Sequence, residues 1–378
     1  MDTTAAVQDR VVQALDANES LDIRAGNSKG HLGRRCQASS TLDVSALDKV
    51  VSYEPGELIL VVQPGMSLKT IEKLLSAENQ HLPFEPPHWG AEATIGGTMA
   101  CNLSGPRRFK AGALRDFILG LEMINGHGEC IRAGGKVVKN VTGYDLSKVL
   151  SGSFGTLGVL TEICLKVWPR PETRQTLVVH GQTPEAALQL MLRLAALPYE
   201  ITGLTYLPAA DLKESRTLAR LEGPGPPVVA QLHKLVSEHI EADTSTMEEE
   251  DSDIWWMSLR ELDPFQPAPG EQLWRFAIPP ASAMQLLETL KKRVPLRWGL
   301  DWGGGLLWAL FPTTVQAAHL HQAARSHQGT AWRFATAADD PNSEAFTPLS
   351  SGVKRLNKIL KNTFDPAGIF NPGRMYEI

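Results

Sequence analysis

Cysteine is scarce in this sequence, and the few residues present lie far apart. Four cysteines occur in 378 residues, and none forms a Cys-x-x-Cys pair. This spacing argues against a zinc ribbon or an iron–sulfur cluster held by this chain, so any iron–sulfur relay would need another chain. Separate thiols without a secretory signal predict reduced cysteines in the cytoplasm. They are Cys36, Cys101, Cys130 and Cys164.

Long apolar runs and an excess of positive charge are also missing. The formal net charge is −5, so the composition gives no electrostatic support for binding to nucleic acid or to an anionic membrane. No apolar run approaches the length of a membrane span. Residues 1–20 mix charged and apolar residues at helical spacing, which predicts an amphipathic helix rather than a signal peptide.

The composition is 43% hydrophobic and 21% charged, which is typical of a globular protein with room for two domains. Short β-like runs alternate with turns over residues 21–64 and predict a strand-rich lobe. Ser67 is a suitable N-cap for a helix over 67–75, where apolar residues recur at helical spacing. A Pro-Arg-Pro break at 169–171 predicts a domain boundary.

A hairpin is predicted over residues 116–133, where two apolar runs flank Asn125-Gly126-His127-Gly128. An Asn-Gly pair tolerates the positive φ angles of a type I′ turn, so this turn type is expected.

After the predicted boundary, helical patterns over 184–197 and 281–292 alternate with β-like runs. The Gly-Pro stretch at 223–227 and the acidic run at 248–253 are predicted as loops. A surface position on a helix is expected for both His319 and His321. About two-thirds of the tryptophans in this part are expected in a core, with a protein interface as the alternative. These tryptophans are Trp255, Trp256, Trp274, Trp298, Trp302 and Trp308.

Four glycine-rich segments stand out in the first half, at 23–33, 93–105, 134–146 and 151–162. The first has neither P-loop nor Rossmann spacing. Glycines allow a backbone to turn tightly and to point successive N–H groups at an anion, so a diphosphate ligand is the first hypothesis. An ordinary turn is the alternative for any one of these segments.

The order and spacing of the four segments together resemble the FAD-binding domain of the vanillyl-alcohol oxidase and p-cresol methylhydroxylase family. The resemblance covers about residues 1–172 and implies an α+β fold of the PCMH type, with FAD between two α+β subdomains. A reduced α+β cap domain is then expected over 173–340. The closing Phe364 to Arg374 resembles the C-terminal signature of the family, so residues 341–378 are expected to return to the FAD domain.

The resemblance also implies which residues bind FAD. The first segment corresponds to the pyrophosphate loop, the second wraps the diphosphate and flavin, and the fourth meets the adenine and ribose. For Arg24, Lys29 and Asn371 a purely structural hydrogen bond is an equal alternative. His31 is weighed as a covalent flavin attachment and is expected to face solvent instead. The expected FAD residues are Arg24, Gly26, Asn27, Ser28, Lys29, Gly30, Thr94, Ile95, Gly96, Gly97, Asn102, Gly105, Gly155, Gly158, Val159, Leu160 and Asn371.

Residues 136–145 and 152–162 most resemble the branch that oxidises 2-hydroxy acids, which includes D-lactate dehydrogenases and glycolate oxidase. Catalytic members of that branch carry a histidine, a Gly-Asp-Gly-Asn run and a second histidine in the cap, where they bind a divalent metal. The nearest stretch here is Leu300 to Trp308, which keeps glycines but has no histidine. No metal is therefore expected, and no catalytic residue can be assigned.

The whole-length pattern resembles the smaller FAD-binding subunits of the bacterial glycolate oxidase family. Such subunits work beside a separate catalytic flavoprotein and an iron–sulfur protein. The resemblance implies a complex that oxidises glycolate, a small 2-hydroxy acid, to glyoxylate and passes electrons to the iron–sulfur partner. It also implies a location in the cytoplasm, with any attachment to the inner face of the plasma membrane made through the complex.

Two alternatives from other classes remain open. The first is a free-standing FAD oxidoreductase for a 2-hydroxy acid or an alditol, in which Arg107, Arg108 or Arg374 clamps a carboxylate. The second is a noncatalytic scaffold that keeps an emptied flavin fold and stabilises its partner.

Overall fold

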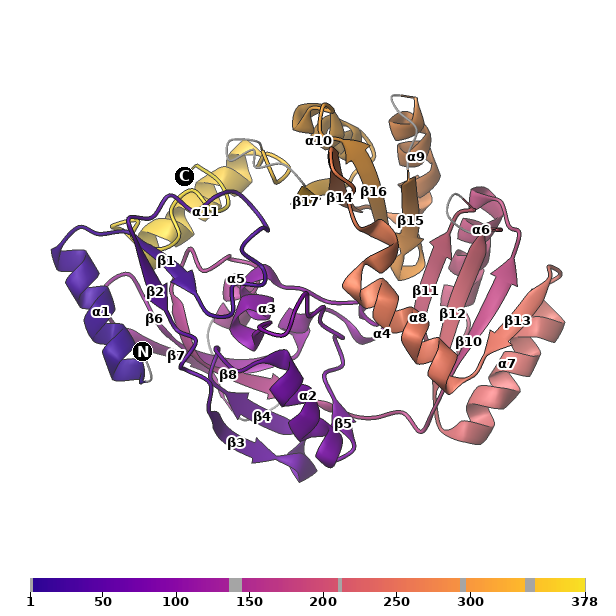
Figure 1. Cartoon of the computed structure of the whole chain (residues 1–378), viewed down its shortest axis with the longest axis horizontal. Coiled ribbons are helices and arrows are strands. Elements are labelled where there is room, and N and C mark those ends of the chain that lie inside the picture. The colour runs from indigo at the N-terminus through magenta and orange to yellow at the C-terminus, as the bar shows by residue number, and fades with distance from the viewer. Residues whose placement is uncertain (1–2, 136–144, 210–212, 293–296, 337–343, 378) are drawn as a thin grey trace. The chain divides into compact units, whose positions relative to one another are not determined.

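The computed structural model describes residues 3–135, 145–209, 213–292, 297–336 and 344–377. The chain divides into two compact units, and each is described by itself. Unit 1 comprises Met1–Ser104, Ala113–Arg170 and Pro348–Ile378, and unit 2 comprises Gly105–Gly112 and Pro171–Thr347. The chain thus leaves unit 1 at Gly105 and re-enters it at Ala113. The C-terminal residues belong to unit 1, although all of unit 2 precedes them in the chain (Figure 1).

Unit 1 is built on a five-stranded antiparallel sheet with the order β3-β4-β8-β6-β7. Its second strand is buried along its whole length, because apolar residues face both sides. The β-like runs expected near the N-terminus are confirmed. The strands of this sheet are β3 (Val50–Glu54), β4 (Ile59–Val62), β6 (Ile118–Ile124), β7 (Cys130–Gly134) and β8 (Val159–Lys166).

A smaller layer of unit 1 joins the two ends of the chain. Strand β1 (Leu21–Arg24) pairs in parallel with β2 (Ser40–Asp43), and Leu21 also bridges to Phe370 near the C-terminus. The expected N-terminal helix is confirmed as α1 (Thr4–Asp16), whose apolar face packs into the same core cluster as Phe370. This core therefore fixes the tail against the start of the chain.

Helices of unit 1 follow the local signals in the sequence. The predicted helix is α2 (Leu68–Ala77), and the Ser67 hydroxyl accepts a hydrogen bond from the Thr70 N–H at 3.1 Å as its N-cap. The remaining elements are β5 (Gln80–His81), α3 (Ile95–Cys101), α5 (Leu146–Leu150), β9 (Trp168–Pro169), α11 (Ser351–Phe364) and two 3-10 turns, η1 (Pro55–Glu57) and η2 (Leu114–Asp116).

The hairpin between β6 and β7 is confirmed, but the expected type I′ turn is wrong. In this turn the positive φ lies at Gly128 (+76°) rather than at Asn125 and Gly126. The Asn125 side chain instead accepts the backbone N–H groups of His127 and Glu129, both at 2.9 Å. A Cβ at Gly126 would lie 2.6 Å from the Cα of Asp365, so glycine at this position lets the C-terminal tail approach closely.

Unit 2 is an eight-stranded antiparallel sheet with the order β13-β10-β12-β11-β15-β16-β14-β17. Its strands are β10 (Thr173–His180), β11 (Ile201–Leu207), β12 (Arg216–Gly223), β13 (Thr244–Met247), β14 (Glu271–Ala277), β15 (Arg297–Asp301), β16 (Leu306–Pro312) and β17 (Thr330–Thr336). Its helices are α4 (Arg108–Ala111), α6 (Pro184–Ala195), α7 (Gly225–His239), α8 (Glu249–Glu261), α9 (Ala283–Lys291) and α10 (Ala317–Ser326), with 3-10 turns η3 (Asp263–Phe265), η4 (Pro280–Ser282) and η5 (Trp302–Gly304).

One face of this sheet and the apolar sides of α6, α7, α9 and α10 form the main core of unit 2. Helix α8 packs on β10 by way of Trp256, whose indole N–H donates to the Thr176 hydroxyl at 2.7 Å. The expectation for the tryptophans is confirmed, because four of the six are buried. They are Trp256, Trp274, Trp298 and Trp308.

Two stretches predicted as loops are the beginnings of helices instead. Residues Glu249, Glu250 and Asp251 occupy the first turn of α8, where carboxylates interact favourably with the positive end of the helix dipole. Helix α7 starts at Gly225, directly after N-cap Pro224, and prolines are tolerated in a first turn because those N–H groups have no helical partner.

The expectation for the two histidines of α10 is half wrong. His319 is exposed, whereas His321 is buried and its Nε2 donates to the Glu344 carbonyl at 2.9 Å. The His321 ring also lies edge-on to Trp274, with 5.1 Å between the ring centroids. Burial is the main cause that lowers the pKa of His321, helped by Arg325 and Arg333 and opposed by the contacts with Glu344.

We expect this histidine to make the protein less stable in acid. Because the folded-state pKa is depressed, the unfolded chain binds the proton more readily, and the free energy of unfolding falls as pH drops below about 6.5. His321→Gln should flatten this decline between neutral pH and about pH 5.5 in urea titrations. His319→Gln is the matched control on the same helix, and an equal effect of both substitutions would contradict the assignment.

Among the described residues, no helix combines the length and the apolar character needed to cross a membrane.

Candidate functional site

The loop after β1 turns as tightly as the sequence predicts. The Glu92 carbonyl oxygen occupies the place where a Cβ at Gly26 would stand, so only glycine fits there. Asn27 has a left-handed backbone (φ +51°), and its carbonyl accepts the Gly30 N–H at 3.1 Å. The loop therefore folds back on itself before it reaches Lys29.

Lys29 is the buried cation of this loop, with 6% of its surface exposed. Its ammonium group donates to the Ser28 hydroxyl at 3.1 Å and lies 5.9 Å from the centroid of the Trp89 ring. Its Cδ lies 3.6 Å from the position that a Cβ of Gly97 would take. A buried positive charge thus sits beside the second glycine segment.

The second segment forms the start of helix α3. The Thr94 hydroxyl accepts the Gly97 N–H at 3.2 Å and caps this helix. Gly96 packs on Pro64, whose carbonyl accepts the Gly96 N–H at 2.8 Å, and a Cβ there would lie 2.6 Å from the Pro64 Cβ. Ile95 is fully buried. The expected residues 94–97 therefore lie with Lys29 in one place.

The last two expected residues of this segment have different surroundings. Asn102 ends α3 in a left-handed conformation (φ +48°), and its side-chain oxygen accepts the Arg115 N–H at 3.3 Å. Gly105 belongs to unit 2, where its carbonyl accepts the indole N–H of Trp302 at 3.2 Å. Gly105 thus stands with a different unit from the other expected FAD residues.

Asn371 ties three segments of unit 1 together. Its Oδ1 accepts the Ile23 N–H at 2.8 Å, and its Nδ2 donates to the Phe154 carbonyl at 2.7 Å. Gly155 has a φ of +67°, and a Cβ there would lie 2.7 Å from the same Nδ2. Both ends of the Asn371 amide are used inside the chain, which matches the structural alternative for this residue.

Replacing Asn371 by aspartate keeps the acceptor for Ile23 but removes the donor for the Phe154 carbonyl. Leaving that carbonyl without its partner should cost about 1–3 kcal/mol of unfolding free energy. Chemical denaturation measures the loss, and the exposed Asn362→Asp on α11 is the matched control. A destabilisation no larger than that of the control would contradict the bridging role.

Residues of the fourth segment lie at the start of β8. Val159 is fully buried opposite Ile124, and Leu160 is half-buried opposite Met123. A Cβ at Gly158 would meet the Met123 side chain and the Ile124 carbonyl, so this glycine permits close packing of β8 on β6. Residues 136–144 of the third segment lie outside the described residues.

The tail adds a second cation to the loop that contains Lys29. The Arg374 guanidinium donates to the Lys29 carbonyl at 3.2 Å and to the Arg34 carbonyl at 3.3 Å. His31 is exposed, as expected, and desolvation and then the charges of Arg374 and Lys29 lower its pKa. Burial raises the pKa of Cys101 to about 11, against the opposing effect of the same two cations. Two positive charges therefore act on one small volume.

This set of groups fits a diphosphate. A buried ammonium, a guanidinium and glycine turns that admit close approach are donors suited to phosphate oxygens. Arg24 differs from Lys29, because its guanidinium is exposed and forms an ion pair with Asp22 at 2.5 Å. Sequence reasoning missed Trp89 and Glu92, which follow no motif and reach the loop only through the fold.

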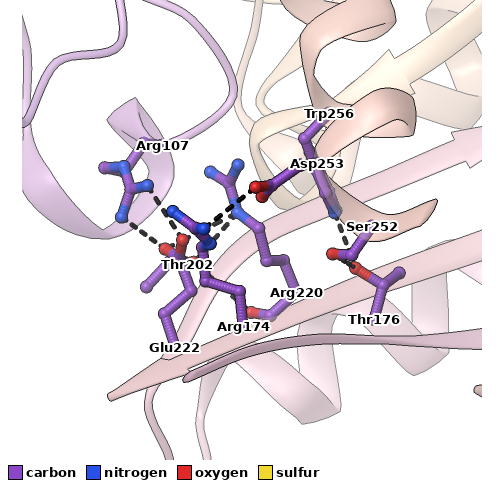
Figure 2. Close-up of polar contacts among 9 residues, drawn as sticks. All are labelled: Arg107, Arg174, Thr176, Thr202, Arg220, Glu222, Ser252, Asp253 and Trp256. Carbon is purple, nitrogen blue, oxygen red and sulfur yellow. Dashed lines mark hydrogen bonds and ion pairs between the residues drawn. The ribbon is translucent and has the colours of Figure 1, made fainter. Parts of the chain in front are cut away.

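The arginines proposed as carboxylate clamps are engaged within the chain. Arg107 in unit 2 donates both terminal nitrogens to the buried Glu222 carboxylate, which Thr202 also contacts (Figure 2). Arg108 lies over the Trp302 ring at 4.4 Å, and Arg374 donates to backbone carbonyls. Arg107 therefore holds its own segment to the sheet of unit 2.

Within the described ranges, no cluster of three or more histidine, cysteine, aspartate or glutamate side chains has the arrangement to hold a metal ion.

Comparison with known proteins shows the family to which the chain belongs. Residues 1–134 match the family described as FAD binding domain. The chain is 40% identical over 376 residues to the protein "Glycolate oxidase subunit GlcE" of Escherichia coli (strain K12), covering 99% of this chain and 98% of that relative. The chain belongs to the glycolate oxidase subunit GlcE family.

A more distant relative and a solved structure are also similar to this GlcE-family chain. "Glycolate oxidase subunit GlcD" of Bacillus subtilis (strain 168) is 38% identical over 144 residues, which are 38% of this chain and 30% of that relative. The solved structure of an alkyldihydroxyacetonephosphate synthase superposes with a TM-score of 0.72 at 16% identity, covering 98% of this chain and 76% of the other. The expected fold class, a PCMH-type FAD-binding α+β protein, is thereby confirmed.

Proposed function

We propose that this chain is the FAD-binding subunit of a glycolate oxidase complex. The complex contains a catalytic flavoprotein of the GlcD type, oxidises glycolate to glyoxylate and passes electrons to an iron–sulfur protein. The observation that carries the proposal is the meeting of Lys29, Arg374 and the glycine turns in one loop cluster. Membership of the GlcE family supports the choice of glycolate among 2-hydroxy acids.

Different residues of unit 1 contribute to FAD binding in different ways. FAD supplies the redox chemistry when it is bound, and the protein supplies position and charge. Lys29 and Arg374 neutralise the diphosphate, and Gly26 and Gly97 let backbone approach it. Asn371 holds the loops from which these groups project.

Two other functions receive less support from the structure. The free-standing enzyme was expected to clamp its substrate carboxylate with Arg107, Arg108 or Arg374, but Arg107 binds Glu222 and Arg108 lies over the Trp302 ring. The noncatalytic scaffold needs no cofactor, whereas Lys29 and Arg374 gather positive charge beside the glycine turns, which suits a bound diphosphate.

Helix α11 supports assembly with a partner. Val353, Leu356 and Ile359 recur at helical spacing on it and are all exposed, Leu356 to 61%. Its sequence has four basic residues and no acidic one, in a chain whose net charge is −5. An apolar stripe with basic flanks suits a groove with an acidic rim on another protein of the complex.

Leu356→Asp should therefore weaken the complex without unfolding the chain, because the side chain it replaces is exposed. We expect at least a roughly tenfold loss of affinity for the partner proteins, as for a substituted interface anchor. Co-purification measures how much of the partner proteins each variant retains, and the melting temperature of the isolated chain shows whether the variant is folded. Asn362→Asp adds the same charge to the exposed surface of the helix as a control, and equal retention of partners by both variants would refute the docking role.

The functional proposal is tested by rebuilding the complex from separately purified proteins, with and without this chain. Glycolate oxidation with transfer of electrons to an artificial acceptor should require the chain loaded with FAD. Full activity of the partner proteins alone would contradict the proposal.

A further inference from the structure

Arg275 lies among aromatic rings on the sheet of unit 2. It is on β14, directly opposite Trp308 of β16 and Trp332 of β17 in the strand register. Its guanidinium carbon is 4.8 Å from the centroid of the Trp302 ring and 5.7 Å from that of Trp332. The neighbours Trp274 and Phe276 belong to the core on the opposite face, so Arg275 points away from the core helices.

This arginine has no anionic partner in the described part of the chain, where its nitrogens form neither a hydrogen bond nor an ion pair. Asp301 is near enough to act on its charge, but the Asp301 carboxylate is engaged by the Thr205 hydroxyl and the Trp302 N–H, both at 2.7 Å. Burial first, and then the like charge of Arg108, lowers the pKa of Arg275 to about 9. A half-buried guanidinium in these surroundings is stabilised by an added anion.

Trp302, which lies beside Arg275, has a strained backbone conformation. Its φ is +51°, a conformation that a bulky residue rarely adopts. The Asp301 carboxylate fixes its N–H, and the Gly105 carbonyl accepts its indole N–H at 3.2 Å. Arg108 covers the ring at 4.4 Å. These contacts fix the position of the Trp302 ring against Arg275.

We infer that Arg275 is the anchor of a binding site for the carboxylate of a small organic acid, with Trp302 and Trp332 as its walls. A planar carboxylate can accept two parallel N–H groups of the guanidinium fork while flat rings flank it. The choice of a 2-hydroxy acid such as glycolate rests on the proposed function. The presence of the site itself rests on the arrangement around Arg275.

The test uses the full chain reconstituted with FAD and titrated with glycolate at constant ionic strength. The change in tryptophan fluorescence measures glycolate binding. Glycolamide, the neutral analogue, is titrated in parallel. We expect wild-type protein to bind glycolate and not glycolamide, and Arg275→Gln to weaken glycolate binding by at least about tenfold. Arg275→Lys, which keeps the charge but loses the fork, should fall between the two.

Lys291→Gln is the matched control, because Lys291 is also a cation over a tryptophan, 5.0 Å from the Trp298 ring centroid. It should bind glycolate as the wild type does. Flavin absorbance and circular dichroism of each variant show whether the chain is folded and loaded. Equal glycolate affinity of Arg275→Gln and wild type, or no preference of the wild type for glycolate over glycolamide, would overturn the inference.

The two proposals fail in different ways. If the wild-type chain retains no flavin, the proposed function fails, whereas glycolate binding through Arg275 can still be observed by fluorescence. If the chain is fully loaded with flavin and Arg275→Gln changes nothing, the carboxylate site fails alone.

Discussion

Replacing Lys29 with methionine should lower the affinity of the chain for FAD by about 2 kcal/mol, or roughly thirtyfold. The ammonium is buried in the loop after β1, so its attraction to a diphosphate is weakly screened by water. Equilibrium titration with FAD, followed by the quenching of flavin fluorescence, gives the affinity.

The same substitution keeps the methylene contacts of the side chain but loses the hydrogen bond to Ser28 and the contact with the Trp89 ring, so the FAD-free chain should lose only about 1 kcal/mol of unfolding free energy. A loss of FAD affinity larger than this loss of stability distinguishes a ligand-binding lysine from a structural one. Lys73→Met, at an exposed position on α2, is the control and should change neither quantity. A Lys29→Met chain that binds FAD normally would remove the basis for the diphosphate site.

The second large effect is expected at Arg107. Arg107→Met would leave the Glu222 carboxylate, whose side chain is 2% exposed, without its principal cation. Breaking a buried ion pair from one side costs about 3–5 kcal/mol. The value here should lie near the lower limit, because Arg220 remains 3.6 Å from Glu222. Urea denaturation of the full chain measures this loss.

A double substitution separates the pair from other effects of the arginine. Arg107→Met with Glu222→Gln should be less destabilising than the sum of the two single changes, since no buried charge is then left unpaired. Lys148→Met breaks an exposed pair with Asp145 and should cost no more than about 0.5 kcal/mol. Strict additivity would contradict an energetic coupling between Arg107 and Glu222, whose hydrogen bonds are drawn in Figure 2.

Elements determined by neighbouring residues were predictable from the sequence. Helix α2 follows from the Ser67 cap and the apolar spacing, and the β6–β7 hairpin follows from two apolar runs around a turn. The turn type was not predictable, because the approach of Asp365 from the far end of the chain determines the use of Gly126. Local sequence patterns thus predicted where helices and hairpins lie, but they did not predict the turn geometry that distant parts of the chain determine.

The candidate site was likewise predictable from the sequence only in part. The glycine positions were visible in the sequence, and Gly26 and Gly155 do have conformations or contacts that exclude a side chain. The burial of Lys29 and the approach of Arg374 depend on the return of the tail. Arg275 was missed because its signal, a guanidinium among tryptophans, arises only from the strand register of unit 2.

The anaerobic visible spectrum of the separately expressed chain, reconstituted with FAD and then mixed with glycolate, tests the central claim most directly. The account predicts a yellow protein with bound, oxidised flavin that stays oxidised until the partner proteins are added. Two results would contradict it. A colourless chain after reconstitution would show that the fold holds no flavin, and bleaching by glycolate alone would show a free-standing enzyme rather than one member of a complex.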